Sequence, residues 1–189
     1  MEVVNRRSLL IAMFLGVFYG CVNAMKAIRS TIKLGIKLYD KGDMLFETQY
    51  WYASLKNDQT YLGSAFLRLR RVESNFGNLT NEEMLELLKI IDMIERTTKK
   101  IFGSSHANWF CLMNHAYRIH PPIPLVHIHL HPRYMQQKII FAGYEFTDNA
   151  PAELFESKDV IVPDSVRKEI IRAYQEEFRN YELLPTNFN

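Results

Sequence analysis

Residues 125–134 read Leu-Val-His-Ile-His-Leu-His-Pro-Arg-Tyr, so three histidines alternate with aliphatic residues. In a β-strand successive side chains point to opposite faces, and this period of two places His127, His129 and His131 on one face. The aliphatic face can then pack against a core while the imidazoles line a cleft or meet solvent. Half of the six histidines of the chain lie in this run, and chance placement is a poor explanation for that.

Three interpretations of the imidazole row follow from the residues alone. The first is nucleophilic catalysis, in which one imidazole attacks phosphorus or an acyl carbon and a neighbour orients it or handles protons. The second is a metal site. Residues two apart in a strand are about 6.5–7 Å apart, so two histidines could share an ion and a third ligand would come from elsewhere. His106, His115 and His120 are candidates, although no recognisable ligand spacing links them to the row. The third is the polar face of an ordinary strand.

Further motifs lie on both sides of the run. Residues 108–118 read Asn-Trp-Phe-Cys-Leu-Met-Asn-His-Ala-Tyr-Arg, and prolines follow at 121 and 122. Upstream the chain has Glu-Thr at 47–48 with Trp51, Asp-Gln-Thr-Tyr-Leu-Gly at 58–63 and Leu-Thr-Asn-Glu-Glu at 79–83, and downstream it has Phe-Ala-Gly at 141–143. Together with the closing Pro-Arg-Tyr at 132–134, these motifs resemble the histidine-triad (HIT) superfamily, most closely its bacterial HIT-domain hydrolases. The resemblance covers about residues 43–180.

The resemblance implies a fold and a set of partners. It implies an α+β domain with a HIT-like antiparallel sheet of about five strands, one long central helix and a C-terminal helix. The residues predict the same class independently, because strands in meander-like order surround one long helix. The resemblance also implies a nucleotide substrate and a homodimer, and it implies no cofactor and no metal.

HIT enzymes are nucleotidyl hydrolases or transferases with the motif His-x-His-x-His, two further residues and often Pro-Arg. The middle histidine attacks the α-phosphate and forms a nucleotidyl-histidine intermediate that water cleaves. When the chain is anchored on Pro132 and Arg133 without gaps, His127 is the nucleophile and His129 is the third histidine. A shifted alignment would make His129 the nucleophile, but it requires a two-residue deletion before Pro132. The resemblance therefore implies that His127 attacks phosphoramidates or dinucleoside polyphosphates.

Some of the positions where the family has further histidines carry another residue in this sequence. His129 would bond phosphate oxygens and stabilise charge in the transition state, and His131, at a variable position of the family, would point into the same face. Leu125, Ser64 and Val72 stand where the family often has supporting histidines. We therefore expect slow or altered activity. A nucleotide-binding protein that has lost turnover is the second hypothesis, and a His-x-His metallohydrolase is a distant third.

Four further residues are candidates for substrate binding. Asn114 resembles the family's polar residue that contacts phosphate or ribose from the neighbouring strand. Asn108 lies earlier on the same predicted strand, and Asn57 would line the nucleoside pocket. Arg133 would contact the substrate or brace a loop through carboxylates. The asparagines also have structural interpretations, as a strand-end amide for Asn108 and as a turn residue for Asn57.

Length and composition limit the class of protein. A chain of 189 residues with 48% hydrophobic and 13% aromatic residues predicts one folded domain. The net charge of +2 gives no reason to expect nucleic acid as a partner. Arg68, Arg70 and Arg71 form a local basic cluster, which a solvated strand face explains as well as phosphate attraction does. Cys21 and Cys111 provide no disulfide framework.

Residues 1–24 differ from the rest of the chain. Arg-Arg at 6–7 precedes an apolar run from 9 to 22, and Val-Asn-Ala at 22–24 is typical of a signal-peptidase site. The run is too short for a comfortable transmembrane helix. Translation from Met25 is the alternative, and the similarity of the rest to intracellular enzymes favours it. We therefore expect a cytoplasmic HIT-like domain over 25–189, exported or in contact with a membrane only if residues 8–22 are translated and retained.

Local patterns place the strands and their connections. Residues 44–48, 50–55 and 65–69 are predicted strands. Residues 108–113 are predicted to form a buried strand, and the proline-rich segment 115–124 connects it to the histidine strand. A further strand is predicted over 138–146, interrupted by Gly143.

Two helices are predicted. Thr80 and Glu83 form a capping box that begins the first, and Gly103 ends it. Its buried stripe is predicted to comprise Met84, Leu87, Leu88, Ile91 and Ile94. The second begins at Pro163, is capped by Asp164 or Ser165, and has apolar residues every four positions from 166 to 178.

Overall fold

A computed structural model describes residues 43–118, 120, 122, 124–136 and 138–181 of the chain. These residues belong to Lys41–Asn189, the second of the two units into which the chain divides. The predicted N-terminal extension, residues 1–24, lies outside the described residues, so its role as an export signal stays a prediction. None of the helices formed by the described residues combines the length and the apolar character that a bilayer span requires.

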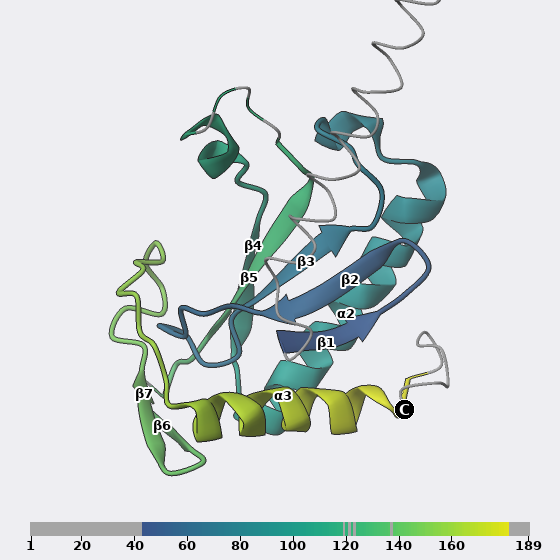
Figure 1. Ribbon diagram of the computed structural model, residues 1–189. Coiled ribbons are helices and arrows are strands. Elements are labelled where there is room, and N and C mark those ends of the chain that lie inside the picture. Colours follow the sequence, from purple (N-terminus) through teal and green to yellow (C-terminus); the bar gives the residue numbers. More distant parts are fainter. Residues whose placement is uncertain (1–42, 119, 121, 123, 137, 182–189) are drawn as a thin grey trace, which may run out of the picture. The chain divides into compact units, whose positions relative to one another are not determined.

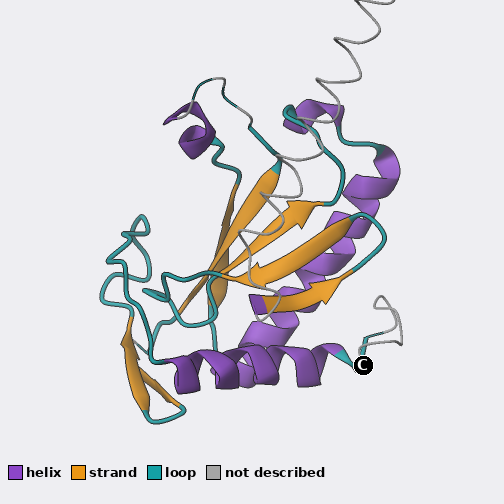
Figure 2. Cartoon of the chain, viewed as in Figure 1, coloured by secondary structure: helices purple, strands orange, loops and turns teal. Residues whose placement is uncertain are grey.

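An antiparallel sheet of five strands forms the centre of the described unit, with helices packed against it (Figures 1 and 2). The strands are β1 (Met44–Glu47), β2 (Trp51–Leu55), β3 (Ala65–Leu69), β4 (His106–Phe110) and β5 (His127–Arg133). Their spatial order is β1-β2-β3-β5-β4, and all neighbouring pairs are antiparallel. A long helix, α2 (Asn81–Phe102), and a C-terminal helix, α3 (Asp164–Phe178), complete the α+β fold. The predicted fold class is confirmed.

Helix α2 begins at the capping box that the sequence predicts. The Glu83 amide donates to the Thr80 hydroxyl at 3.2 Å, and the Thr80 amide donates to the Glu83 carboxylate at 2.8 Å. Gly103 ends the helix with a left-handed φ of 75°, a conformation that glycine adopts without steric cost. Both ends of the helix are therefore fixed by local sequence.

The buried face of α2 differs in part from the predicted stripe. Leu87 and Ile94 are buried as expected, but Leu88 is 58% exposed, and the prediction is wrong there. Ile90 and Met93, which the predicted stripe omits, are buried instead. Met84 and Ile91, the other two predicted residues, are partly buried and pack against the core. Leu88 is therefore the one member of the predicted stripe that lies outside the buried face.

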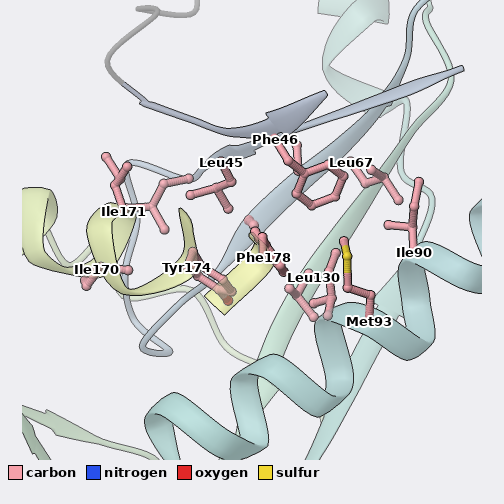
Figure 3. Close-up of a cluster of buried hydrophobic side chains, with 14 of the residues drawn as sticks. Leu45, Phe46, Leu67, Ile90, Met93, Leu130, Ile170, Ile171, Tyr174 and Phe178 are labelled. Carbon is pink, nitrogen blue, oxygen red and sulfur yellow. The ribbon is translucent and has the colours of Figure 1, made fainter. Parts of the chain in front are cut away.

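Helix α3 packs with the sheet and α2 around one hydrophobic core (Figure 3). Its predicted apolar positions are all buried, namely Val166, Ile170, Tyr174 and Phe178. The Phe178 ring meets the Phe46 ring of β1 edge to face, with centroids 4.9 Å apart. Aromatic pairs in this geometry gain energy beyond the area that they bury, so this contact ties the C-terminal helix to the first strand.

The predicted cap of α3 is wrong. Pro163 occupies the N-cap position, and no side chain there bonds the helix amides. Asp164, one of the two predicted caps, is instead the first helical residue. Its carboxylate lies in the first turn, where the helix dipole favours negative charge.

Residues 138–146 form a hairpin rather than one interrupted strand. The hairpin consists of β6 (Lys138–Phe141) and β7 (Tyr144–Thr147), which make a separate two-stranded sheet. Its turn residues, Ala142 and Gly143, have φ angles of 47° and 74°. Two consecutive positive φ angles match the tight turn that suits the twist of a hairpin, so Gly143 reverses the chain.

Strand β4 also differs from the prediction. It starts at His106 and ends at Phe110, and its residues are partly buried or exposed rather than buried. The reason is its place at the end of the sheet order, where β5 is its partner among the described strands. After β4 the chain leaves the sheet and forms a short 3-10 helix, η3 (Asn114–Arg118).

Candidate active site

Strand β5 lies between β3 and β4 and presents the imidazole row on one face of the sheet. The aliphatic residues that alternate with the histidines, Val126, Ile128 and Leu130, are all buried in the core. The predicted alternation is therefore confirmed. The imidazoles share the opposite face, and the ring centroids of His127 and His129 are 4.9 Å apart.

A backbone hydrogen bond defines the tautomer of His127. Its Nδ1 lies 2.8 Å from the carbonyl oxygen of Leu125. Because a carbonyl only accepts hydrogen bonds, Nδ1 carries the proton and Nε2 keeps the lone pair. Burial lowers the pKa of His127, and the Leu125 hydrogen bond opposes this shift. The ring is thus neutral at pH 7, and the lone pair on Nε2 is available.

His129 lies between two aromatic rings. The Phe66 ring meets it at 4.8 Å in an edge-on geometry, and the Phe110 ring stacks on it at 4.9 Å. Burial, followed by the charge of His127, lowers the pKa of His129 to about 3. Its Nε2 is buried and has no hydrogen-bond partner among the described residues. A buried polar atom without a partner is costly, and a substrate oxygen or a water would satisfy it.

His131 is the most buried of the three imidazoles, with 2% of its surface exposed. Its Nε2 lies 2.8 Å from the ammonium of Lys56, and its Nδ1 has no hydrogen-bond partner in the described part of the chain. The rings of Phe110 and Phe155 both meet it edge-on at 4.9 Å. Burial, followed by the charge of Lys56, lowers the pKa of His131 to about 3. His131 is therefore a neutral acceptor for the lysine.

The Arg133 guanidinium forms its hydrogen bonds with other groups of the protein. Its Nε and Nη2 donate to the two carboxylate oxygens of Asp148 at 2.8 and 3.0 Å, and both side chains are almost fully buried. Nη1 donates to the side-chain oxygen of Asn108 at 2.8 Å, and further bonds reach the carbonyls of Ala150 and Glu153. Of the two roles that the sequence left open, these contacts favour the loop brace, and they give Asn108 a supporting role.

Two cations near the imidazoles were not assigned to the site from sequence. Lys56 follows β2, and Arg68 lies opposite His127 in the pairing of β3 with β5. The Arg68 guanidinium donates to Ser54 at 2.6 Å and lies 4.2 Å from the centre of the Phe66 ring. Arg68 is buried, which corrects the interpretation of a solvated basic cluster for this member of it. Strand alternation puts Phe66 and Arg68 on one face, but only the register reveals that this face is the imidazole face.

The two remaining candidates lie on exposed loops. Asn57 is exposed in the turn after β2, and Asn114 is exposed at the start of η3. Asn114 was expected on the strand beside the histidines, and this placement is wrong because β4 ends four residues earlier, at Phe110. The contacts of the described residues leave a substrate-binding role for both asparagines as a prediction.

The positions that lack family histidines are occupied in different ways. Ser64 is buried and its hydroxyl donates to the Tyr61 carbonyl at 2.7 Å. Val72 is 46% exposed. Leu125 contributes no imidazole, yet its carbonyl orients His127. The tautomer of the predicted nucleophile therefore does not depend on the missing first histidine.

The chemistry of the row favours an anionic ligand. Neutral imidazoles and two cations share one face of the sheet, and positive charge in a partly dehydrated site attracts anions. Within the described ranges, no group of three or more His, Cys, Asp or Glu side chains is arranged to hold a metal ion.

Comparisons with known proteins find similarity in the fold but none in the sequence searches. A scan against protein-family models gives no match, and a search of curated proteins gives none. Solved structures do match. A histidine-triad protein from Marinobacter aquaeolei VT8 has 19% identity and a TM-score of 0.54, over 71% of this chain and 88% of that one. A histidine-triad protein from Sinorhizobium meliloti 1021 has 16% identity and a TM-score of 0.54, over 71% and 90%.

A third match is a diadenosine triphosphate hydrolase from Plasmodium falciparum, solved in complex with Cyclomarin A. It has 14% identity and a TM-score of 0.52, over 74% of this chain and 78% of that one. Similarities at these identities concern the fold. The chain therefore has the histidine-triad fold, and the predicted resemblance to the HIT superfamily is confirmed at that level.

Proposed function

We propose that this chain is a HIT-like hydrolase or nucleotidyltransferase that cleaves nucleoside phosphate derivatives at the α-phosphate, with His127 as the nucleophile. The observation that carries the proposal is the 2.8 Å hydrogen bond between Nδ1 of His127 and the Leu125 carbonyl. It leaves the lone pair on Nε2, in a row of neutral imidazoles beside two cations. A nucleophilic histidine that attacks a phosphate anion needs this combination.

The proposed reaction has two displacements. The Nε2 lone pair of His127 forms a bond to the α-phosphorus, and the bond from phosphorus to the leaving oxygen or nitrogen breaks. The leaving group takes the electron pair, and a leaving nitrogen also takes a proton from solvent, so that it departs as the neutral amine. In the second step a water oxygen attacks phosphorus and loses a proton to solvent. The N–P bond then breaks, its electron pair returns to Nε2, and the nucleoside monophosphate is released. In the transferase reaction another acceptor replaces water.

The remaining site residues have supporting roles in this proposal. His129 and Arg68 stabilise the charge that develops on the phosphate oxygens. Asn57 and Asn114 contact the nucleoside or the phosphate. Arg133 braces the loop beside the imidazole row. The expected substrates are phosphoramidates or dinucleoside polyphosphates, and the fold shared with a diadenosine triphosphate hydrolase supports the second class.

The alternative is a nucleotide-binding protein without turnover. The observation that favours it is the loss of the supporting histidines at Leu125, Ser64 and Val72. The Ser64 hydroxyl donates its hydrogen bond to the Tyr61 carbonyl, and the side chain of Val72 has no polar group. Loss of groups that support a reactive site lowers activity by about 10- to 100-fold in metal sites, and we expect a comparable cost here.

Intact-mass analysis tests the proposal. The full chain is mixed with an adenosine phosphoramidate or a diadenosine polyphosphate, and products are assayed in parallel. We expect a nucleotidyl adduct or AMP release that disappears in His127→Ala. His129→Ala is the control for the alignment, because it should slow turnover while the adduct still forms at His127. Nucleotide binding with neither adduct nor product would contradict the enzyme hypothesis and support a nucleotide-binding protein without turnover.

We also propose a homodimer and a cytoplasmic location. β4 lies at the end of the sheet, where its outer edge faces no partner among the described strands, and such an edge is open to pairing with another chain. Size-exclusion chromatography with light scattering measures the mass of the protein in solution. A monomer at micromolar concentration would contradict the dimer. Fractionation of cells that express the full chain tests the location, and recovery in the membrane or exported fraction would contradict it.

A further inference from the structure

Lys56 is held on the imidazole face. Its ammonium lies 2.8 Å from Nε2 of His131 and 5.4 Å from the centre of the Phe66 ring. No ion pair between Lys56 and a carboxylate occurs in the described part of the chain. The nearby Asp58 carboxylate accepts hydrogen bonds from Thr60, Ser157 and Val160 instead. An ammonium has three donors, so the histidine leaves part of its bonding capacity open.

The contact with His131 fixes a side chain that is ordinarily flexible. A lysine at the surface holds its charge on four rotatable carbons and samples many positions. Here the acceptor is an imidazole that is 2% exposed and packed between the rings of Tyr61 and Phe155. The ammonium is therefore anchored at one place beside the row. Burial lowers the pKa of Lys56, and the charges of Asp58 and Asp159 oppose that shift.

Arg68 marks the other end of the same charged surface. It lies opposite His127 in the strand pairing, whereas Lys56 contacts His131. Both cations lie over the Phe66 ring, whose edge-on contacts reach His127 and His129. Positive charge thus extends along the row from its first imidazole to its last. A single phosphate at His127 would meet the Arg68 end and leave the Lys56 end without an anion.

We infer that Lys56 binds a second phosphate group of the substrate, next to the α-phosphate at His127, and that His131 is the residue that positions Lys56. The inference rests on the proposed function and narrows its substrate class. It favours substrates with two or more linked phosphates over phosphoramidates and other substrates with a single phosphorus. A charge-assisted hydrogen bond of this kind corresponds to about 10- to 100-fold in affinity.

Calorimetric binding of AMP and ADP to the full chain tests the inference without requiring turnover. We expect wild type to bind ADP about 10- to 100-fold more tightly than AMP. Lys56→Met, which keeps the length of the side chain, should abolish most of this difference, because it should weaken ADP binding far more than AMP binding. Lys89→Met is the matched control, because Lys89 is exposed on α2, and it should change neither affinity.

Two variants test His131 as a positioning residue. His131→Gln keeps a side-chain acceptor and should retain part of the preference for ADP, whereas His131→Leu removes the acceptor and should lose it. Circular dichroism melting of each variant shows that it is folded. An equal affinity of wild type for AMP and ADP would overturn the inference, as would a Lys56→Met variant that weakens both nucleotides equally.

The outcomes also separate this inference from the proposed reaction. A preference for ADP that depends on Lys56, without any adduct at His127, would keep the second phosphate site and reject the enzyme. Adduct formation at His127 without a preference for linked phosphates would keep the enzyme and reject the role of Lys56. A chain that binds neither nucleotide would overturn both.

Discussion

Arg133 and Asp148 form a two-point ion pair inside the domain, with Nε–Oδ2 and Nη2–Oδ1 distances of 2.8 and 3.0 Å. The pair lies where β5 leaves the imidazole row and where the loop after β7 begins. The same guanidinium bonds the carbonyls of Ala150 and Glu153 in that loop. The loop in turn carries Phe155 to His131. The ion pair thus connects the stability of the domain to the shape of the site.

Replacement of Arg133 by methionine should lower the free energy of unfolding by about 3–5 kcal/mol, because Asp148 would remain buried as an unpaired charge. Urea denaturation measures the difference. Arg172→Met is the control, since Arg172 pairs with Glu169 and Glu176 on the exposed side of α3, and exposed pairs contribute less than about 1 kcal/mol. Equal losses in the two variants would contradict the assigned role of Arg133.

Two glycines with similar backbone angles provide a second test. Gly63 has a φ of +82° and Gly103 a φ of +75°. A Cβ on Gly63 would lie 2.8 Å from the Phe102 ring and from the Tyr174 hydroxyl, whereas a Cβ on Gly103 would meet nothing within 4 Å. Gly103→Ala should therefore cost only the left-handed penalty of about 1–2 kcal/mol. Gly63→Ala should cost clearly more. Similar melting temperatures for the two variants would contradict this packing around Gly63.

Local patterns predicted the framework of this domain well. The alternation at residues 126–131 gave the correct faces of β5, and the capping box of Thr80 and Glu83 gave the correct start of α2. These features depend on neighbours within a few residues. The hairpin at 138–147 was missed because a single glycine is compatible with both a bulge and a turn, and the φ of Ala142 decides between them.

The site was predicted less completely because its contacts join distant parts of the chain. Lys56 and His131 are 75 residues apart, and the sequence around Lys56 indicates only a turn. Arg68 reaches the imidazole face through a strand register that no local pattern specifies. The row of histidines itself was found because its members are neighbours on one strand.

The buried imidazole of His131 should make the stability of the domain depend on pH. Burial first, and the charge of Lys56 second, lower its pKa to about 3 in the folded chain, against about 6.5 in an unfolded chain. Below pH 6.5 the unfolded chain therefore takes up a proton that the folded chain does not. The free energy of unfolding should fall by about 1.4 kcal/mol per pH unit for this residue as the pH decreases from 6.5 toward 3.

Urea denaturation of wild type and His131→Gln at pH 7.0, 6.0 and 5.0 measures this slope. The variant has no titrating group at the position, so its stability should decrease less steeply with acid. His106→Gln is the control, because His106 is exposed at the start of β4 and its removal should leave the slope as in wild type. Parallel slopes for wild type and His131→Gln would show that His131 is not held neutral.

The Phe155 ring, which packs against His131, should help to keep the pKa of His131 low. It stacks on Phe110 with centroids 4.3 Å apart and an interplanar angle of 3°, and it meets His131 at 4.9 Å. Phe155→Ala would admit water to the imidazole and remove part of the desolvation that disfavours its charged form. The pKa of His131, measured by NMR titration of the ring protons, should therefore rise from about 3 toward the ordinary value of about 6.5. Leu154→Ala is the matched control, because Leu154 is 90% exposed and its loss should leave the titration unchanged. An identical pKa of His131 in wild type and in Phe155→Ala would contradict this role of Phe155. It would mean that the packing of the strands alone excludes water from the imidazole.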